Sequence, residues 1–251
     1  MFAKAPWPEG TGRHVLDAVD STNAHALRLG LRGPAWLLAG EQTAGKGRRG
    51  RPWTSPRGNF HASLVLQPTE PPDQVALRSF AAALALLDAL VSLTGLPQAF
   101  ALKWPNDVLL NGGKLAGILL ESSGQAGRVT DLVIGIGVNL IAAPGLDAME
   151  PGALRPVTLL EETGLRVTPE AFLDTLAPAY AHWETVFTEQ GFAPLRTEWL
   201  RHAARLGEVI RARTGTQTRH GVFATIDPQG ALVLDTDTGR IAIPAAEVFF
   251  C

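Results

Sequence analysis

The stretch ALKWPNDVLLNGGKLAGILLES, residues 101–122, contains apolar segments separated by turn-forming residues. Asn111, Gly112 and Gly113 lie at the predicted tip, and these residue types tolerate the positive φ angles that tight hairpin turns require. The stretch therefore predicts a strand, a turn and a second antiparallel strand. Because Lys103 and Lys114 flank this hairpin, we expect their side chains to lie close together.

Another strand is predicted downstream, in the sequence RVTDLVIGIGVNL at residues 128–140. Side chains alternate between the two faces of a strand, and four large apolar residues share one face here: Ile134, Ile136, Val138 and Leu140. The other face carries Gly135, Gly137 and Asn139. This strand should bury one face in the core and leave a hollow on the other. Two further short apolar segments, AWLLAG at 35–40 and FHASLVLQP at 60–68, also predict strands.

Helical periodicity separates these strands. Five apolar residues repeat at helical spacing in the segment 71–94, with Gly95 as the expected end: Leu77, Phe80, Leu84, Leu87 and Val91. A strand followed by a helix is predicted over 14–30, a long helix from Thr168 that Pro178 should kink, and a shorter helix near 195–204. This order of elements predicts the α+β class, with a mixed, mostly antiparallel sheet backed by helices.

The pattern of predicted elements changes after about residue 206, where short strand-like segments alternate with turns. We therefore predict two domains. Residues 1–205 form the main domain with the mixed sheet, and residues 206–251 form a small C-terminal β-barrel.

Composition narrows the class of protein. A formal net charge of -2 disfavours a surface built to neutralise nucleic acid, and the one cysteine, Cys251, cannot form an intrachain disulfide. The beginning of the chain has no apolar signal segment, and the apolar stretch 80–93, interrupted by Asp88, is expected to be too short to span a bilayer. The six histidines lack paired ligand spacing, so no residue is assigned to a metal. We expect a cytoplasmic protein without a membrane anchor.

The segment GEQTAGKGRRGRPWTSPRGNF, residues 40–60, places four basic residues within the six positions 46–51 and spaces them with glycines. Gly45, Gly47 and Gly50 fit G-x-G-x-x-G, but a dinucleotide fingerprint must open a helix, and prolines follow here instead. A Walker loop would need its lysine after the last glycine. A solvated basic loop is the simplest alternative.

Two details favour ligand binding over a solvated loop. Glycines between arginines let the backbone approach a ligand, and Trp53 offers a flat face on which a base could stack. The arginines carry forked donors that suit carboxylate and phosphate groups. The loop is therefore interpreted as a site for an organic anion together with a nucleotide.

Three motifs in this order, GKGRRGRPW, KWPNDVLLNGGKLAGILLE and GIGVNL, resemble the catalytic domain of biotin protein ligases. The segments DSTN, EQTAG and SPRGN also stand where that family has them, so the resemblance is strong from about residue 15 to 140 and loose in the C-terminal part. It implies a fold of the class II synthetase and biotin ligase type with an SH3-like C-terminal barrel. It further implies activation of biotin by ATP to biotinyl-5'-AMP, and transfer of biotin to a lysine of a biotin carboxyl carrier protein.

The resemblance also implies roles for individual residues. Four residues would be catalytic: Arg48, Lys103, Asp107 and Lys114. Biotin would contact Ser21, Thr22, Asn23, Gln42, Lys46, Gly47, Arg48, Lys114, Gly117 and Gly135. ATP, accompanied by Mg²⁺, would contact Arg48, Arg51, Trp53, Asn106, Lys114 and Asn139. The reaction needs fixed positive charge between two anions rather than an enzyme nucleophile, since the amine of the carrier lysine attacks the adenylate.

Several of these residues also have structural interpretations. Ser21 and Thr22 could cap a helix, Lys103 and Lys114 could be surface charges, and Pro105, Asn106 and Asp107 could form a turn. For Asp107, orienting the incoming lysine, helping to deprotonate it and holding magnesium all stay open. The glycines could instead be strand bulges.

Lys46 stands where many relatives carry arginine, which keeps the charge but loses the planar fork. Fewer than fourteen residues precede the first predicted strand, so we expect no N-terminal DNA-binding module and no DNA binding. A homodimer is expected from the resemblance. Two alternatives remain: a lipoate or octanoate ligase or transferase of the same general fold, and a non-catalytic biotin or nucleotide sensor.

Overall fold

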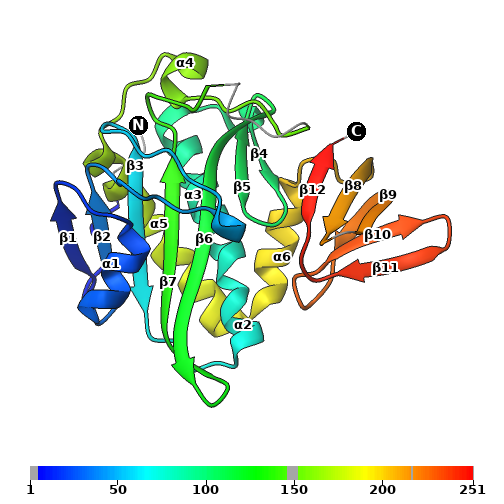
Figure 1. Ribbon diagram of the computed structural model, residues 1–251, viewed down its shortest axis with the longest axis horizontal. Coiled ribbons are helices and arrows are strands. Elements are labelled where there is room, and N and C mark those ends of the chain that lie inside the picture. Colours follow the sequence, from blue (N-terminus) through cyan, green and yellow to red (C-terminus); the bar gives the residue numbers. More distant parts are fainter. Residues whose placement is uncertain (1–4, 146–151, 216, 251) are drawn as a thin grey trace.

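The computed structural model describes residues 5–145, 152–215 and 217–250. Its main element is a seven-stranded sheet with the order β1-β2-β3-β7-β6-β5-β4 (Figure 1). β1 and β2 are parallel, and the other neighbouring pairs are antiparallel. The strands are β1 (Gly12–Leu16), β2 (Ala35–Ala39), β3 (Phe60–Leu66), β4 (Phe100–Lys103), β5 (Asp107–Leu110), β6 (Gly113–Gln125) and β7 (Arg128–Val138). The predicted mixed, mostly antiparallel sheet is confirmed.

Helices cover one face of this sheet, and α1 lies on the other (Figure 1). The helices are α1 (Thr22–Leu29), α2 (Pro72–Ala76), α3 (Arg78–Thr94), α4 (Leu159–Thr163), α5 (Pro169–Gln190) and α6 (Phe192–Arg201). The candidate site lies on the sheet face that is covered by α1 and by the basic loop, the segment 40–60.

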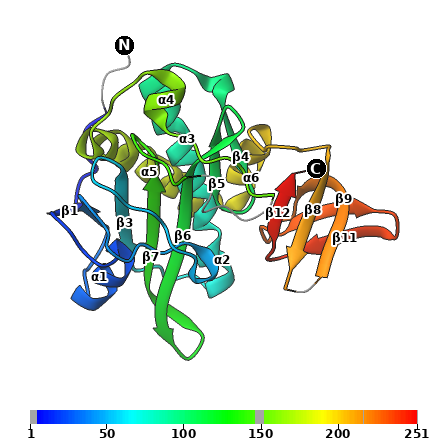
Figure 2. The same ribbon diagram turned by 45° about the horizontal axis from the view of Figure 1, so that its top comes forward.

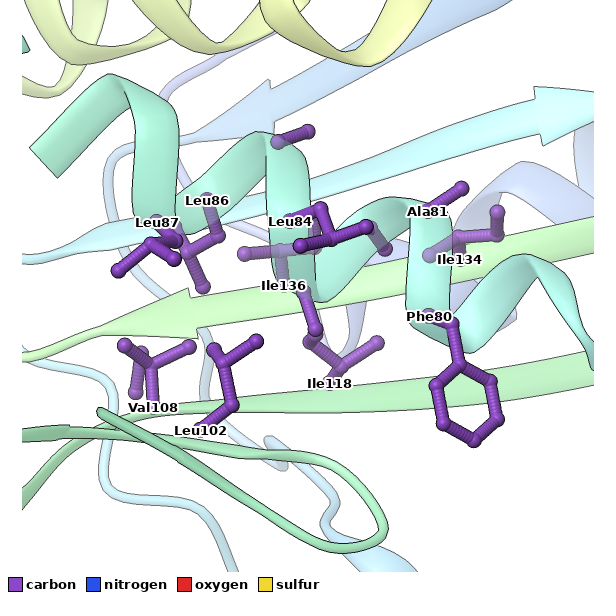
Figure 3. Packing of buried hydrophobic residues seen from close by; sticks show 14 of the residues in the cluster. Phe80, Ala81, Leu84, Leu86, Leu87, Leu102, Val108, Ile118, Ile134 and Ile136 are labelled. Atoms are coloured by element: carbon purple, nitrogen blue, oxygen red, sulfur yellow. The ribbon is translucent and has the colours of Figure 1, made fainter. Parts of the chain in front are cut away.

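The core lies between α3 and the helix-side face of the sheet. Figure 3 shows α3 side chains packed against strand residues that include Ile118, Ile134 and Ile136. The predicted apolar stripe of α3 is confirmed, because Leu77, Phe80, Leu84 and Leu87 are buried and Val91 packs against the same core. Burial of these side chains is the main driving force that fixes which sheet face is internal.

Together, α2 and α3 cover Pro72–Thr94, a 23-residue segment that is long and apolar enough, by length and composition, to cross a membrane. The apolar stretch 80–93 is only part of this segment, because the helical region begins upstream of Phe80. Most of it is buried inside the protein, which is the normal environment of a core helix.

The hairpin prediction was incomplete. The segment 101–122 forms three strands rather than two, with a first turn at 104–106 and a second at 111–112. Lys103 and Lys114 are thus two turns apart, on β4 and β6, and Asp107 begins the strand between them. Asn111 and Gly112 take the positive φ angles of 49° and 78° that the second turn requires.

The long helix predicted from Thr168 is confirmed as α5, which runs from Pro169 to Gln190 with Pro178 in its interior. The kink at Pro178 stays a prediction. The short helix α4 was not predicted, because five residues are too few to show a helical period. Its Thr158 side chain accepts a hydrogen bond from the Glu161 N–H and caps it.

The C-terminal part forms a separate antiparallel sheet with the order β11-β10-β9-β8-β12. Its strands are β8 (Val209–Thr214), β9 (Gln217–Ile226), β10 (Leu232–Thr236), β11 (Gly239–Ile243) and β12 (Glu247–Phe250). A bend at Pro244 and Ala245 separates β11 from β12. Since the described strands do not pair β11 with β12, the SH3-like barrel remains a prediction, as does the domain boundary at 205.

Candidate active site

Every residue that the sequence assigned to catalysis, biotin or ATP lines one pocket of about 430 Å³. Such a volume is typical of sites for small organic ligands. The pocket lies between the α1 side of the large sheet, the basic loop and strand β12. Figures 1 and 2 both show the C-terminal sheet beside the β4–β5 end of the large sheet. The sheet, the loop and β12 thus close the site from three sides.

One row of paired residues crosses the large sheet through this site. Neighbouring strands place Lys103, Asp107, Gly117, Gly137 and His61 directly opposite one another, in that order from β4 to β3. Cross-strand partners point to the same face, so the charges at one end of the row and the glycines at its centre share the pocket side.

Asp107 is the centre of a buried charge cluster. Its carboxylate lies 2.8 Å from the Lys114 Nζ and 3.6 Å from the Lys103 Nζ. Burial alone would raise the pKa of Asp107, but the charges of Lys114 and Lys103 outweigh it, so this pKa falls below its usual value. Burial lowers the pKa of Lys103, and Asp107 opposes that shift. The predicted convergence of the two lysines is confirmed, and an ionised carboxylate joins them.

Arg48 reaches the same cluster from the basic loop. Its guanidinium donates a hydrogen bond to the Asn106 Oδ1 at 3.3 Å, and the Asn106 Nδ2 donates to the Ile118 carbonyl at 2.7 Å. Burial lowers the pKa of Arg48, while Asp107 partly offsets that effect. Asn106 therefore helps to hold the Arg48 guanidinium near Asp107.

The basic loop folds back on itself. The Gly47 N–H donates to the Arg51 carbonyl at 2.7 Å, and the Trp53 N–H donates to the Gly45 carbonyl at 2.9 Å. Arg49 takes the left-handed region with φ 57°, which costs a non-glycine residue energy. The loop thus forms a short, closed lobe over the pocket.

A carboxylate of the C-terminal sheet holds this lobe. Glu247 on β12 contacts three arginines, with N–O distances of 3.4 Å to Arg49, 2.5 Å to Arg51 and 2.6 Å to Arg213. The Arg51 hydrogen bond, together with Arg213, lowers the pKa of Glu247 to about 2, although burial opposes the shift. Glu247 therefore joins the loop to the second sheet. Sequence reasoning missed Glu247, because nothing in the sequence near residue 247 relates it to a loop two hundred residues earlier.

We expect Glu247→Gln to weaken this link and to lower the free energy of unfolding at pH 7 by about 1 kcal/mol, since the pair is partly solvated. A carboxylate whose pKa is lowered by folding stabilises the fold above its unfolded pKa and loses that contribution at lower pH. The difference between the wild-type and variant proteins should therefore shrink as the pH falls from 4.5 to about 2. Urea unfolding at several pH values would measure this difference, and a constant difference would contradict the assignment.

Trp53 occupies the space that the glycines leave open. A Cβ atom added to Gly137 would lie 2.5 Å from the Trp53 Nε1, and one added to Gly117 would lie 3.3 Å from the Trp53 ring. The Lys114 Nζ lies 5.6 Å from the centre of the same ring. The hollow predicted beside β7 is real, but in this structure its floor at Gly117 and Gly137 is covered by an indole.

The polar cluster at the start of α1 lies on the same face. Ser21 caps the helix by accepting from the Ala24 N–H at 3.5 Å, so the predicted cap is confirmed. The Gln42 Oε1 accepts from the Thr22 N–H at 2.8 Å, and Asn23 packs over Gly135. Sequence reasoning missed three polar partners of this cluster: Ser55, Ser63 and Glu121. Ser63 and His61 alternate with apolar residues in the predicted strand segment 60–68, and that alternation was the available signal.

Asn139 lies at the end of β7 and fastens the returning chain. Its Nδ2 donates to the Val157 carbonyl at 3.2 Å, and its own carbonyl accepts from the Leu159 N–H at 2.9 Å. It lines the pocket, as predicted, but one of its side-chain donors already serves this internal contact.

The charged residues of the pocket show whether the protein itself could hold a magnesium ion there. Within the described ranges, no three His, Cys, Asp or Glu side chains form a group that could hold a metal ion. The two acidic residues that line the pocket, Asp107 and Glu247, are each paired with lysines or arginines. Carboxylates neutralised in this way are poor ligands for a hard cation. The residues present therefore do not fit a dedicated protein-held magnesium site.

A pocket in which three cations converge fits an enzyme that activates a carboxylic acid with a nucleotide. Known protein families agree with this class. The model of the Biotin/lipoate A/B protein ligase family matches residues 16–139, and that of the Biotin protein ligase C terminal domain matches residues 206–251.

Individual relatives agree as well. The chain is 58% identical to a biotin–acetyl-CoA-carboxylase ligase of Paracoccus denitrificans, over 94% of this chain and 99% of that protein. It is 30% identical to the bifunctional ligase/repressor BirA of Escherichia coli strain K12, over 95% of this chain and 76% of that protein. A structure of the Aquifex aeolicus biotin protein ligase in complex with biotin and ATP superposes with a TM-score of 0.80, at 27% identity, covering 94% and 97% of the two chains. The chain belongs to the biotin protein ligase family and is a ligase.

Proposed function

We propose that the protein joins biotin to ATP and then transfers biotin to a lysine of a biotin carboxyl carrier protein, such as that of acetyl-CoA carboxylase. In the first step, a biotin carboxylate oxygen attacks the α-phosphorus of ATP, and pyrophosphate leaves. In the second step, the carrier amine attacks the acyl carbon of biotinyl-5'-AMP, and AMP leaves with the bonding electrons. The observation that carries the proposal is the convergence of Arg48, Lys103 and Lys114 in the pocket.

The cation cluster suits the first step. Two anions must approach each other, and charge builds further on the phosphoryl oxygens and the leaving group. Lys114 and Arg48 are proposed to hold the carboxylate and the α-phosphate, and Lys103 adds positive charge beside them. These groups are held in place by Asp107 and Asn106 before substrate arrives, so little reorganisation is needed during reaction.

Asp107 is proposed to act in the second step as well. Its lowered pKa keeps it ionised, and an ionised carboxylate beside the acyl group can orient the ammonium of the carrier lysine and accept its proton. Because Lys103 and Lys114 compete for the same carboxylate, positioning of the amine is its main proposed role.

The remaining residues are proposed to distribute between the two ligands. Ser21, Thr22, Gln42, Lys46 and Gly47 would surround biotin. Arg51, Trp53 and Asn139 would contact ATP. Magnesium is proposed to enter with the ATP phosphates and to keep its waters, as this ion commonly does.

Pyrophosphate exchange tests the first step. Labelled pyrophosphate should enter ATP only when biotin is present, and replacing biotin with lipoate should reduce the exchange to background. Exchange with lipoate instead would favour the lipoate ligase alternative. Binding of biotin and ATP without any exchange would favour the sensor and overturn the proposal.

A homodimer and action in the cytoplasm are also proposed. β4 and β1 are the edges of the large sheet, and the β4 edge is covered because Leu102 exchanges backbone hydrogen bonds with His202 and Ala204. β1 remains as the candidate edge for pairing with a second copy. Sedimentation at several concentrations would test the dimer, and cell fractionation would test the location. We propose residues 1–205 as the catalytic domain and 206–251 as the domain that supplies Glu247.

A further inference from the structure

A chain of buried and partly buried hydrogen bonds runs behind the α1 end of the pocket. It begins at Glu121 on β6, where the Asn23 Nδ2 donates to the carboxylate at 2.8 Å and to the Leu119 carbonyl at 3.3 Å. The Ser63 Oγ lies 2.6 Å from the Asn23 Oδ1 and 2.7 Å from the Thr22 Oγ1. Thr22, Asn23 and Ser63 are each at most 4% exposed, so water does not compete for these bonds.

The chain continues into the basic loop. The Gln42 Oε1 accepts from the Thr22 N–H at 2.8 Å, and the Gln42 Nε2 lies 2.8 Å from the Ser55 Oγ. Ser55 in turn donates to the Trp53 carbonyl at 3.0 Å. The chain therefore connects a strand of the large sheet with the base of the loop.

Glu121 fixes the direction of these bonds. A carboxylate and a carbonyl only accept hydrogen bonds, so the Asn23 amide must turn its Nδ2 toward them and its Oδ1 toward Ser63. A serine hydroxyl has one proton, and Ser63 must donate it to the Asn23 Oδ1. The Thr22 hydroxyl must then donate inside the protein, where the Ser63 Oγ at 2.7 Å and the Gln42 Oε1 at 3.1 Å compete for its one proton. Its remaining lone pair is left for the pocket, which Thr22 lines.

Given the proposed function, on which this inference rests, we propose that Glu121 and Ser63 are positioning residues for biotin. Through Asn23 they hold the Thr22 hydroxyl as an acceptor for a ring N–H group of the ligand. Asn23 itself uses both of its side-chain atoms inside the protein, so its role is to transmit this orientation. A ligand ring without an N–H donor would leave the Thr22 lone pair buried and unpaired, which disfavours its binding.

Paired variants at Glu121 test the proposal. Glu121→Met keeps the length of the side chain but removes the acceptor, and it should raise KM for biotin about tenfold in pyrophosphate exchange. Its kcat and its KM for ATP should stay within about twofold of the wild-type values, because the cation cluster is untouched. Glu121→Gln retains an acceptor oxygen and should restore the wild-type KM.

Ser63→Ala should raise the KM for biotin as Glu121→Met does. The KM of the double variant should not exceed that of the more impaired single variant, since both changes break the same chain of hydrogen bonds. A biotin methylated at a ring nitrogen provides a second readout. Its KM relative to biotin should be high for the wild-type protein and lower by about fivefold in Glu121→Met, because the lost N–H matters less once Thr22 is no longer oriented.

Three results would overturn the proposal. The first is an unchanged, wild-type KM for biotin in Glu121→Met. The second is that Glu121→Met and Glu121→Gln both lower kcat and raise the KM for biotin and the KM for ATP to the same extent. The third is that the effects of Glu121→Met and Ser63→Ala add in the double variant. Failure of the proposed function has a different signature, namely absence of biotin-dependent exchange in the wild-type protein, which would remove both proposals.

Discussion

Lys114→Met should lower kcat/KM for biotin-dependent pyrophosphate exchange about 100-fold or more, because it removes a fixed positive charge from the place where two anions meet. Lys114 lies 2.8 Å from Asp107 and lines the pocket, so its ammonium is already oriented in the absence of substrate. Initial rates at varied biotin and ATP concentrations would measure the loss and assign it to binding or to chemistry.

A nearby arginine provides the matched control. Arg155 is exposed, pairs with Glu162, and does not line the pocket, although its backbone carbonyl accepts a hydrogen bond from the Lys114 N–H. Arg155→Met should keep the exchange rate within about twofold of wild type. If Lys114→Met were equally active, the cation cluster would not be the seat of the chemistry.

Asp107→Asn should cost about 3 kcal/mol in the free energy of unfolding, because it leaves Lys103 buried without a counter-charge. The side chains of both residues are only 11% exposed, so solvent cannot replace the lost partner. The amide keeps the shape of the carboxylate, and the cost is therefore electrostatic. Denaturant unfolding of the wild-type and variant proteins would measure it, with Asp73→Asn on the exposed start of α2 as a control.

The loss of stability in Asp107→Asn should also depend on pH, in a direction that follows from the pKa of Lys103. Burial already lowers the pKa of Lys103, and loss of Asp107 removes the stronger of the two negative charges that oppose that shift, so the pKa should fall further. A lysine whose folded pKa lies below its unfolded value of 10.5 makes the protein more stable as the pH rises toward that value. The difference in free energy of unfolding between the wild-type protein and Asp107→Asn should thus be largest near neutral pH and should shrink at alkaline pH. A deficit that grows with pH would contradict the buried pair.

Much of the fold could be predicted from local patterns. The stripe of α3 and the alternation in β7 identified the buried faces, because helices and strands repeat with fixed periods. The glycines of β7 predicted the hollow on the opposite face. The turn at 104–106 was not resolved as a separate hairpin, because β4 and β5 have only four residues each.

The site shows the same division between local and distant information. Lys103, Asp107 and Lys114 are close in sequence, so turn chemistry alone brought them together. The contacts of Glu247 with the basic loop, and of Glu121 with Asn23, join residues that are distant in the chain. Neither contact leaves a local pattern, and tertiary packing alone determines them.

Because one row of residues crosses the large sheet, ligand binding at the site depends on correct pairing of the strands. Lys103, Asp107, Gly117 and Gly137 come from four strands, and each lines the pocket only in one register. A slip of one residue in any of these strands would turn its contribution toward the core helices. Ligand binding therefore stabilises only chains in which these four strands have paired correctly, and the fraction of a preparation that binds ligand measures how much of it has reached that arrangement.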